Sequence, residues 1–177
     1  MRLPPPSAHY SQCVRYGRYL ARRLRRAKLA TLAADVEKVT LAIRANGRAL
    51  EDADDAIQEA IADRDGSDDD LDNAAQTARA KLAGRSADAD RKPPYTHIFH
   101  EGLAYYTAAP LDEEVARYGE LKVRLEEHLP ASDKVRAAAV AAIDAGVAAF
   151  SKAAATLTKA RTEESLASTH LDAARES

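Results

Sequence analysis

The residues best suited to chemistry lie close together in the segment His97-x-x-His100-Glu101. Imidazole and carboxylate groups are ligands for zinc or iron, and three of them on one loop could in principle hold such an ion. The spacing alone is weak evidence, because no other histidine or cysteine is close in sequence. We therefore predict no metal site and no cofactor, and we interpret these residues as polar groups on the surface of a loop.

Other spacings that catalysis requires are absent from the sequence. There is no glycine-rich phosphate loop and no Gly-x-Ser-x-Gly turn for a nucleophile. A di-iron bundle needs Glu-x-x-His on facing helices, and Glu126-Glu127-His128 has the wrong spacing. The single cysteine, Cys13, has no Cys-x-x-Cys partner and excludes a disulfide framework. We predict a protein that is not an enzyme and has no evident small-molecule substrate.

Composition favours an all-α protein, which we expect in the cytoplasm. The chain has 177 residues, a net charge of −2 and 40 alanines that recur at helical spacing. No apolar run approaches the roughly 18 residues that a membrane-spanning helix needs, so we predict no membrane span. The N-terminal segment lacks the apolar stretch that secretory signals carry.

The arginines near the N-terminus form the most distinctive surface. The first 34 residues hold eight basic residues and no acidic one. Four arginines step by 3, 4 and 3 residues along one helix face, and two more widen it: Arg15, Arg18, Arg22 and Arg25, with Arg23 and Arg26. Such a face suits nucleic-acid phosphates, anionic lipid headgroups or an acidic protein surface. Residues 35–72 of a second copy are one such surface, with 13 acidic and four basic residues. The remaining interpretation is a charged helix end that is simply solvated.

A heptad pattern predicts the longest element. From residue 29, steps of 3 and 4 alternate over more than four heptads, which is typical of a coiled coil. The seam consists of Leu29, Leu32, Val36, Val39, Ile43, Asn46, Leu50, Ala53, Ile57 and Ala60. We predict one helix over residues 8–64, ended by Asp65-Gly66-Ser67. A chain reversal near Gly66 leads to a second helix over residues 67–86.

Residues 87–110 interrupt the helical pattern. Prolines at positions 93, 94 and 110 bracket four of the nine aromatic residues. We predict an ordered aromatic loop, in which residues 95–107 form either a small β-hairpin or an irregular structure. Its aromatic residues are candidate partner-binding residues, together with the six arginines: Tyr95, Phe99, Tyr105 and Tyr106.

Two more helices are predicted over residues 111–129 and 132–175. Pro110 followed by acidic residues marks the start of the first, and Pro130 separates the two. All four helices would form a single elongated, antiparallel domain over residues 1–177, with two long and two short helices. A reversal near Gly66 would place Gly47 opposite Phe150. Asn46 would then be either a register device or a tolerated polar residue in the seam.

The expected function follows from this architecture. We expect a non-enzymatic structural or adaptor protein that mediates protein–protein assembly through its coiled-coil helices and aromatic loop. A two-helix stalk buries little apolar area, which favours a homo-oligomer or a second protein as partner over a monomeric bundle with frayed ends. The alternative is a nucleic-acid-binding accessory protein that uses the basic N-terminal helix face.

Overall fold

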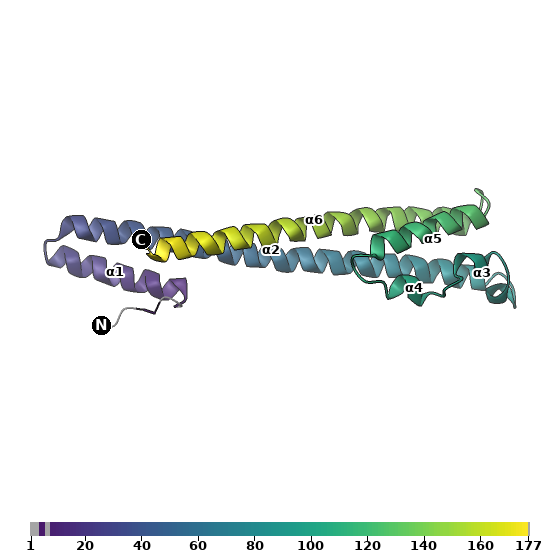
Figure 1. The fold of residues 1–177 in the computed structure, drawn as a ribbon, viewed down its shortest axis with the longest axis horizontal. Helices are drawn as coiled ribbons and strands as arrows, with labels where there is room; N and C mark the ends of the chain where they lie inside the picture. Colours follow the sequence, from purple (N-terminus) through teal and green to yellow (C-terminus); the bar gives the residue numbers. More distant parts are fainter. Residues whose placement is uncertain (1–3, 6–7, 177) are drawn as a thin grey trace. The chain divides into compact units, whose positions relative to one another are not determined.

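Helices are the only extended elements in the computed structural model, which describes residues 4–5 and 8–176 (Figure 1). In chain order they are α1 (Tyr10–Arg26), α2 (Ala30–Ala83), a short 3₁₀ helix (Ala89–Arg91), α3 (Tyr95–Ile98), α4 (Ala104–Thr107), α5 (Glu114–His128) and α6 (Lys134–Glu176). The described residues contain no strand, and the predicted all-α fold is confirmed. Arg2, one of the eight N-terminal basic residues, lies outside the described residues.

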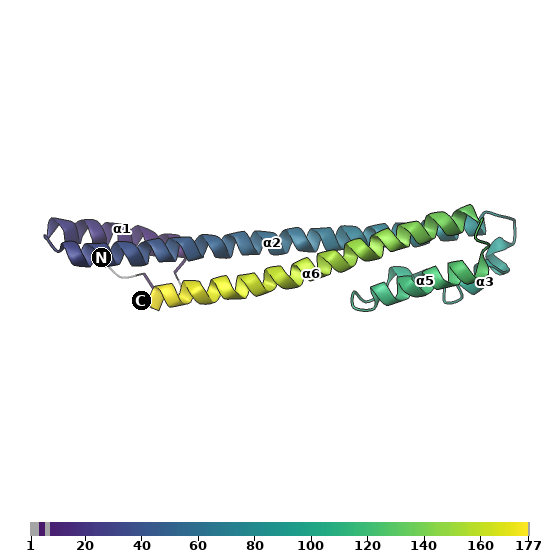
Figure 2. The same ribbon diagram turned by 90° about the horizontal axis from the view of Figure 1, so that it is seen from above.

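The predicted helix over residues 8–64 is wrong between residues 27 and 29, where the chain turns back on itself (Figures 1 and 2). α1 ends at Arg26, and Lys28 has a left-handed φ of 62°. The backbone N–H of Leu29 donates to the carbonyl of Leu24 at 3.0 Å and closes the turn. Neither glycine nor proline marks this turn in the sequence.

The physical reason for the turn lies in the heptad seam itself. Continued from Leu29 towards the N-terminus in steps of 4 and 3, the seam would fall on Arg25, Arg22, Arg18 and Arg15. A single helix would therefore carry four guanidinium groups in its apolar stripe, and burying unpaired charges costs much free energy. Ending the helix at Arg26 lets α1 turn a different face towards α2, with Val14, Gly17 and Ala21 buried.

The predicted reversal near Gly66 is also wrong, because α2 is one continuous helix of 54 residues through that position. The heptad spacing runs on from Ala60 through Ser67 to Leu71, and all three are buried. Ser67 stays inside the helix by donating its hydroxyl to the carbonyl of Asp63 at 2.8 Å. Glycine in a helix interior costs about 1 kcal/mol relative to alanine, which the packing of the continuous seam outweighs. Residues 67–86 are thus mainly the end of α2.

The chain divides into two compact units, and the first contains residues 1–59 and 157–177. In it, α1 lies alongside the beginning of α2, and the end of α6 packs against both helices (Figure 1). Their shared core consists of Val14, Ile43, Leu171 and Ala174. Three helices therefore meet where a two-helix stalk was predicted.

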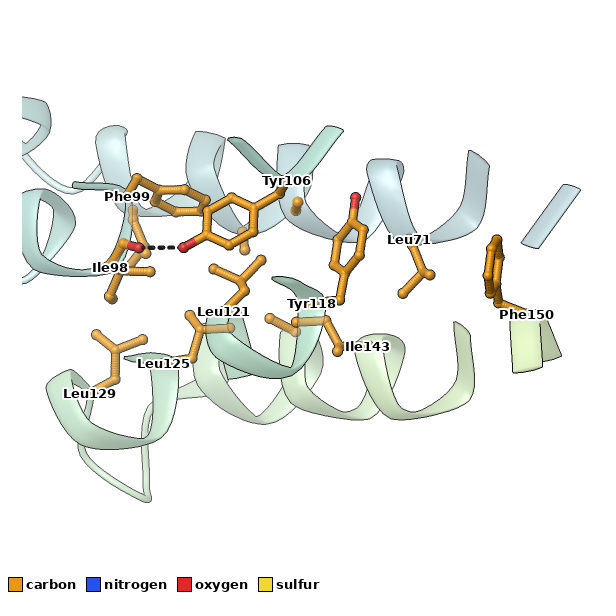
Figure 3. Packing of buried hydrophobic residues seen from close by; sticks show 14 residues of the cluster. Leu71, Ile98, Phe99, Tyr106, Tyr118, Leu121, Leu125, Leu129, Ile143 and Phe150 are labelled. Atoms are coloured by element: carbon orange, nitrogen blue, oxygen red, sulfur yellow. Dashed lines mark hydrogen bonds between the residues drawn. The ribbon is translucent and has the colours of Figure 1, made fainter. Parts of the chain in front are cut away.

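The second unit, residues 60–156, contains the larger core (Figure 3). The end of α2, all of α5 and the beginning of α6 contribute side chains to it: Leu71, Ala75, Ala78 and Leu82; Tyr118, Leu121 and Leu125; Ala139, Ile143 and Phe150. Gly146 lets α6 approach α2 closely, since a Cβ there would lie 2.6 Å from a methyl carbon of Leu71. The Tyr118 hydroxyl donates to Asp72 at 2.6 Å and joins α5 to α2.

The predicted register between the long helices is shifted by about 20 residues. Asn46 Nδ2 donates to the carbonyl of His170 at 3.1 Å, so residue 46 lies beside residue 170 rather than near 150. Gly47 instead faces Tyr10, and Phe150 lies in the core of the second unit. The shift follows from the missing reversal at Gly66. The bounds of α5 and α6, in contrast, lie within three residues of the predicted helices 111–129 and 132–175.

By length and composition alone, α6 is long and apolar enough to cross a membrane. α6 contains an 18-residue window with a mean hydropathy of 1.4, contrary to the expectation that no apolar stretch approaches that length. Its alanines account for this value, and 28% of the window is buried. A single helix of this kind is weak evidence for a membrane span.

Candidate functional site

The aromatic segment is part of the core rather than an exposed docking loop. In place of the predicted β-hairpin or irregular loop, residues 95–107 form the short helices α3 and α4. Phe99 and Tyr106 are 4% and 1% exposed, and the Tyr106 hydroxyl donates to the carbonyl of Ile98 at 3.1 Å (Figure 3). Burial of these two side chains removes them as a surface for a partner.

The other two aromatic candidates are half-buried and hold the segment in place. The Tyr95 hydroxyl accepts a hydrogen bond from Arg79 at 2.8 Å. The Tyr105 hydroxyl donates to Glu120 at 3.0 Å, and the guanidinium of Arg117 lies 4.6 Å from the centre of the Tyr105 ring. The hydrogen bond to Glu120 is the main cause that raises the pKa of Tyr105.

The histidine segment does not gather metal ligands. The ring of His97 lies beside that of His128, tilted by 58° with ring centres 4.9 Å apart, whereas His100 pairs with Glu101 at 3.1 Å and contacts Arg124. Among residues 4–5 and 8–176, no group of three or more histidine, cysteine or acidic side chains is arranged to hold a metal ion.

Two glycines set how closely α1 approaches α2. A Cβ at Gly17 would overlap the hydroxyl of Thr40, and a Cβ at Gly47 would overlap the ring of Tyr10. Tyr10 also donates its hydroxyl to Glu51 at 2.7 Å, which is the main cause that raises the pKa of Tyr10. We call this pair of helices, residues 10–48, the hairpin. Two grooves run along it, one on each flank of the Gly17–Thr40 contact.

The first groove is largely apolar and lies next to the end of α6. It has a volume of about 850 Å³. Its walls come from Pro4 and Pro5, α1, α2 and the end of α6. The main apolar residues of the helices are Tyr16, Leu20, Val36, Val39 and Ile43, and the charged ones are Asp35, Asp172, Arg175 and Glu176. We call it the apolar groove. Its α2 wall belongs to the same heptad seam that packs against α6 further along.

The seam residues around the start of α2 are open. Because residue 46 lies beside residue 170, Glu176 is about level with residue 40. Leu29, just before α2, and Leu32 are 46% and 53% exposed. In both views the turn of the hairpin lies beyond the end of α6 (Figures 1 and 2).

The second groove is lined by arginines from both helices of the hairpin. It consists of two adjoining hollows of about 660 and 240 Å³ that share Arg15 and Arg18. Six arginines line the two hollows: Arg15, Arg18, Arg22 and Arg25 from α1, with Arg44 and Arg48 from α2. We call it the arginine groove. The structure thus brings together four of the six predicted arginines.

The sequence pattern does not predict two residues of the arginine groove. Arg44 and Arg48 are one helical turn apart, but they lie within residues 35–72, whose acidic excess conceals them. Only the fold back at residues 27–29 places them beside α1. Arg23 and Arg26, which were predicted to widen the face, are exposed and do not line the groove.

Most groove arginines have no counter-charge. Arg25 pairs with Glu37 at 2.6 Å. Within the described part of the chain, the other five make neither an ion pair nor a side-chain hydrogen bond. Tyr19 and Leu41 lie between them and are 45% and 63% exposed.

No family model, curated protein or solved structure matches this chain.

Proposed function

We propose that this chain is a non-enzymatic adaptor that assembles with another polypeptide through the apolar groove of its hairpin. The single observation that carries the proposal is the exposed heptad seam around the start of α2, where Leu29 and Leu32 are 46% and 53% exposed. Seam positions of a coiled coil are stable when a second helix covers them. We propose that an amphipathic helix from another chain packs along this seam and covers Leu29, Leu32 and Val36.

The groove also indicates the chemistry of that helix. Its apolar floor calls for an apolar stripe with helical spacing. Asp35 and Glu176 lie at its walls, and basic residues beside the stripe would complement them. A second copy of this chain is one possible donor, and a different protein is the other.

Light scattering after size-exclusion chromatography tests the proposal first. We expect an assembly heavier than the 19.1 kDa chain, or, for a different donor, a chain that assembles only when that protein is present. Leu32→Asp should return a self-assembly to the monomer, because it places a charge in the covered seam. Leu41→Asp is the matched control, since Leu41 is also exposed but lies outside the seam and lines the arginine groove.

Site-specific photo-crosslinking in cells tests the case of a different donor. A photoreactive side chain at position 32 should give one defined adduct, and the same group at exposed Lys38 should not. The proposal is contradicted if the purified chain is a monomer and position 32 yields no adduct. It is equally contradicted if Leu32→Asp and Leu41→Asp affect assembly alike.

A further inference from the structure

We propose that the arginine groove binds single-stranded nucleic acid, with its guanidinium groups on the phosphates and Tyr19 against a base. This site is independent of the proposed adaptor function, because it lies on the other flank of the Gly17–Thr40 contact and shares no apolar seam residue with the apolar groove.

The hairpin carries a high local positive charge. The hairpin, residues 10–48, holds ten basic and two acidic residues, a net charge of +8, in a chain whose total is −2. Folding α1 back onto α2 adds Arg44 and Arg48 to the arginines of α1 and so brings like charges together. Uncompensated like charges in one groove raise its potential and attract a polyanion.

Most arginines of the groove have no acidic partner among the described residues. Glu37 is the acidic residue among those that line the groove, and it already pairs with Arg25. The guanidinium groups of Arg15, Arg18 and Arg22 make no ion pair with a described residue. Their hydrogen-bond donors are therefore available to an external acceptor.

The spacing of the arginines indicates the type of anion that they bind. Residues 15 and 25 are about 15 Å apart along α1, so the guanidinium groups form a row rather than a cluster. A row matches a polymer with evenly repeated negative charge, and guanidinium groups bind phosphate in a bidentate manner. Lysine is absent from the lining residues of both hollows.

Tyr19 in the groove favours a single strand over a duplex. Tyr19 lines the same groove as Arg18 and Arg22 and is 45% exposed. Aromatic side chains between cationic ones stack on bases that are free of a partner strand. In a duplex the faces of the bases are stacked on one another and unavailable to Tyr19.

Fluorescence anisotropy measures this binding directly. The probes are a labelled oligo-dT and a labelled oligo-U of about 20 nucleotides and a duplex of the same length, with the full chain. We expect both single strands to bind more tightly than the duplex. Five phosphate contacts predict a loss of about 100-fold in affinity between about 50 and 200 mM salt. Comparison of the DNA and RNA strands shows which of the two is preferred.

Matched charge-reversal variants distinguish binding in the arginine groove from nonspecific attraction of nucleic acid to a positive surface. Arg18→Glu with Arg22→Glu should abolish binding, whereas Arg23→Glu with Arg26→Glu makes the same charge change on the same helix outside the groove and should weaken binding far less. Tyr19→Ala should weaken binding at least about fivefold, and Tyr19→Phe should not. Circular dichroism confirms that each variant is folded.

Three results would overturn the proposal. One is no binding of either strand at low salt. A second is equal loss in the two charge-reversal pairs, which would reduce the groove to unspecific positive charge. The third is displacement of the strands by poly-L-glutamate or anionic phospholipid vesicles at equal charge, which would point to an acidic protein or a membrane. None of these results bears on the assembly through the apolar groove.

Discussion

Glu114, at the start of α5, is a carboxyl group inside the protein and is 1% exposed. Neither of its carboxyl oxygens accepts a hydrogen bond from a described residue. Burial first, then a hydrogen bond with Asp68 and the negative charges of Asp68 and Asp72, raise the pKa of Glu114 to about 8 from an ordinary value of 4.5. At neutral pH the folded protein therefore holds Glu114 protonated, because a charge there would be both desolvated and repelled.

This raised pKa predicts that alkaline conditions destabilise the fold. The folded state binds the Glu114 proton more tightly than the unfolded state does, so the stabilising effect is complete below pH 4.5 and is lost as pH rises through about 8. Glu114→Gln keeps a neutral side chain at every pH and should flatten the fall of the melting temperature over this range. Above pH 8 the variant should melt at a higher temperature than the natural chain.

Thermal unfolding monitored by circular dichroism across this pH range checks the prediction. Glu126→Gln is the control, because Glu126 is an exposed residue of the same helix. The account of Glu114 is wrong if Glu114→Gln and Glu126→Gln show the same pH dependence as the natural chain.

At the scale of the elements, the packing of α1 on α2 depends on the absence of a side chain at Gly17. A Cβ there would meet the Oγ1 of Thr40, whose hydroxyl already donates to the carbonyl of Val36 at 2.6 Å. Thr40 is buried, so it has little room to move. Thr40 lines both grooves of the hairpin, which lie on either side of this contact.

Gly17→Ala should lower the free energy of unfolding by about 1–3 kcal/mol, because it overpacks the contact. The loss should be smaller in a Thr40→Ala background, where the obstructing hydroxyl is absent, with a coupling of at least about 0.5 kcal/mol. Chemical denaturation of the four chains measures the coupling. Gly66→Ala is the control: it has open space around its Cβ and should stabilise α2. Additive effects of Gly17→Ala and Thr40→Ala would contradict the contact.

The elements also show what the sequence could predict. α5 and α6 were placed within three residues, because Pro110 and Pro130 stop helices for steric reasons that need no tertiary context. The prediction of a turn at Gly66 is wrong because a glycine permits a turn without requiring one. The heptad seam that continues through Ser67 and Leu71 indicates a continuous helix more strongly. The turn at Lys28 carries no glycine or proline, and its only mark was the change of the seam from leucines to arginines.

On the scale of the whole molecule, the turn at residues 27–29 decides which surfaces the hairpin presents. A single helix over residues 8–64 would place Arg44 and Arg48 far from Arg15 and Arg18, and it predicts a basic surface on one helix only. The positive surface itself was predictable from composition. The two-sided groove was not, because it depends on where the chain turns back. Phe99 and Tyr106 lie in the core, because aromatic side chains serve a core as readily as an interface.

The fold back of α1 onto α2 is the claim on which both grooves depend, and a spin-label distance tests it most directly. With Cys13 replaced by serine, labels are attached to cysteines at exposed positions 11 and 45, and pulsed electron resonance measures their separation. Packed helices lie about 8–10 Å apart, so the hairpin predicts a distance below about 25 Å with the label arms included. A continuous helix would separate the two positions by about 51 Å, and a distance near that value would contradict the account.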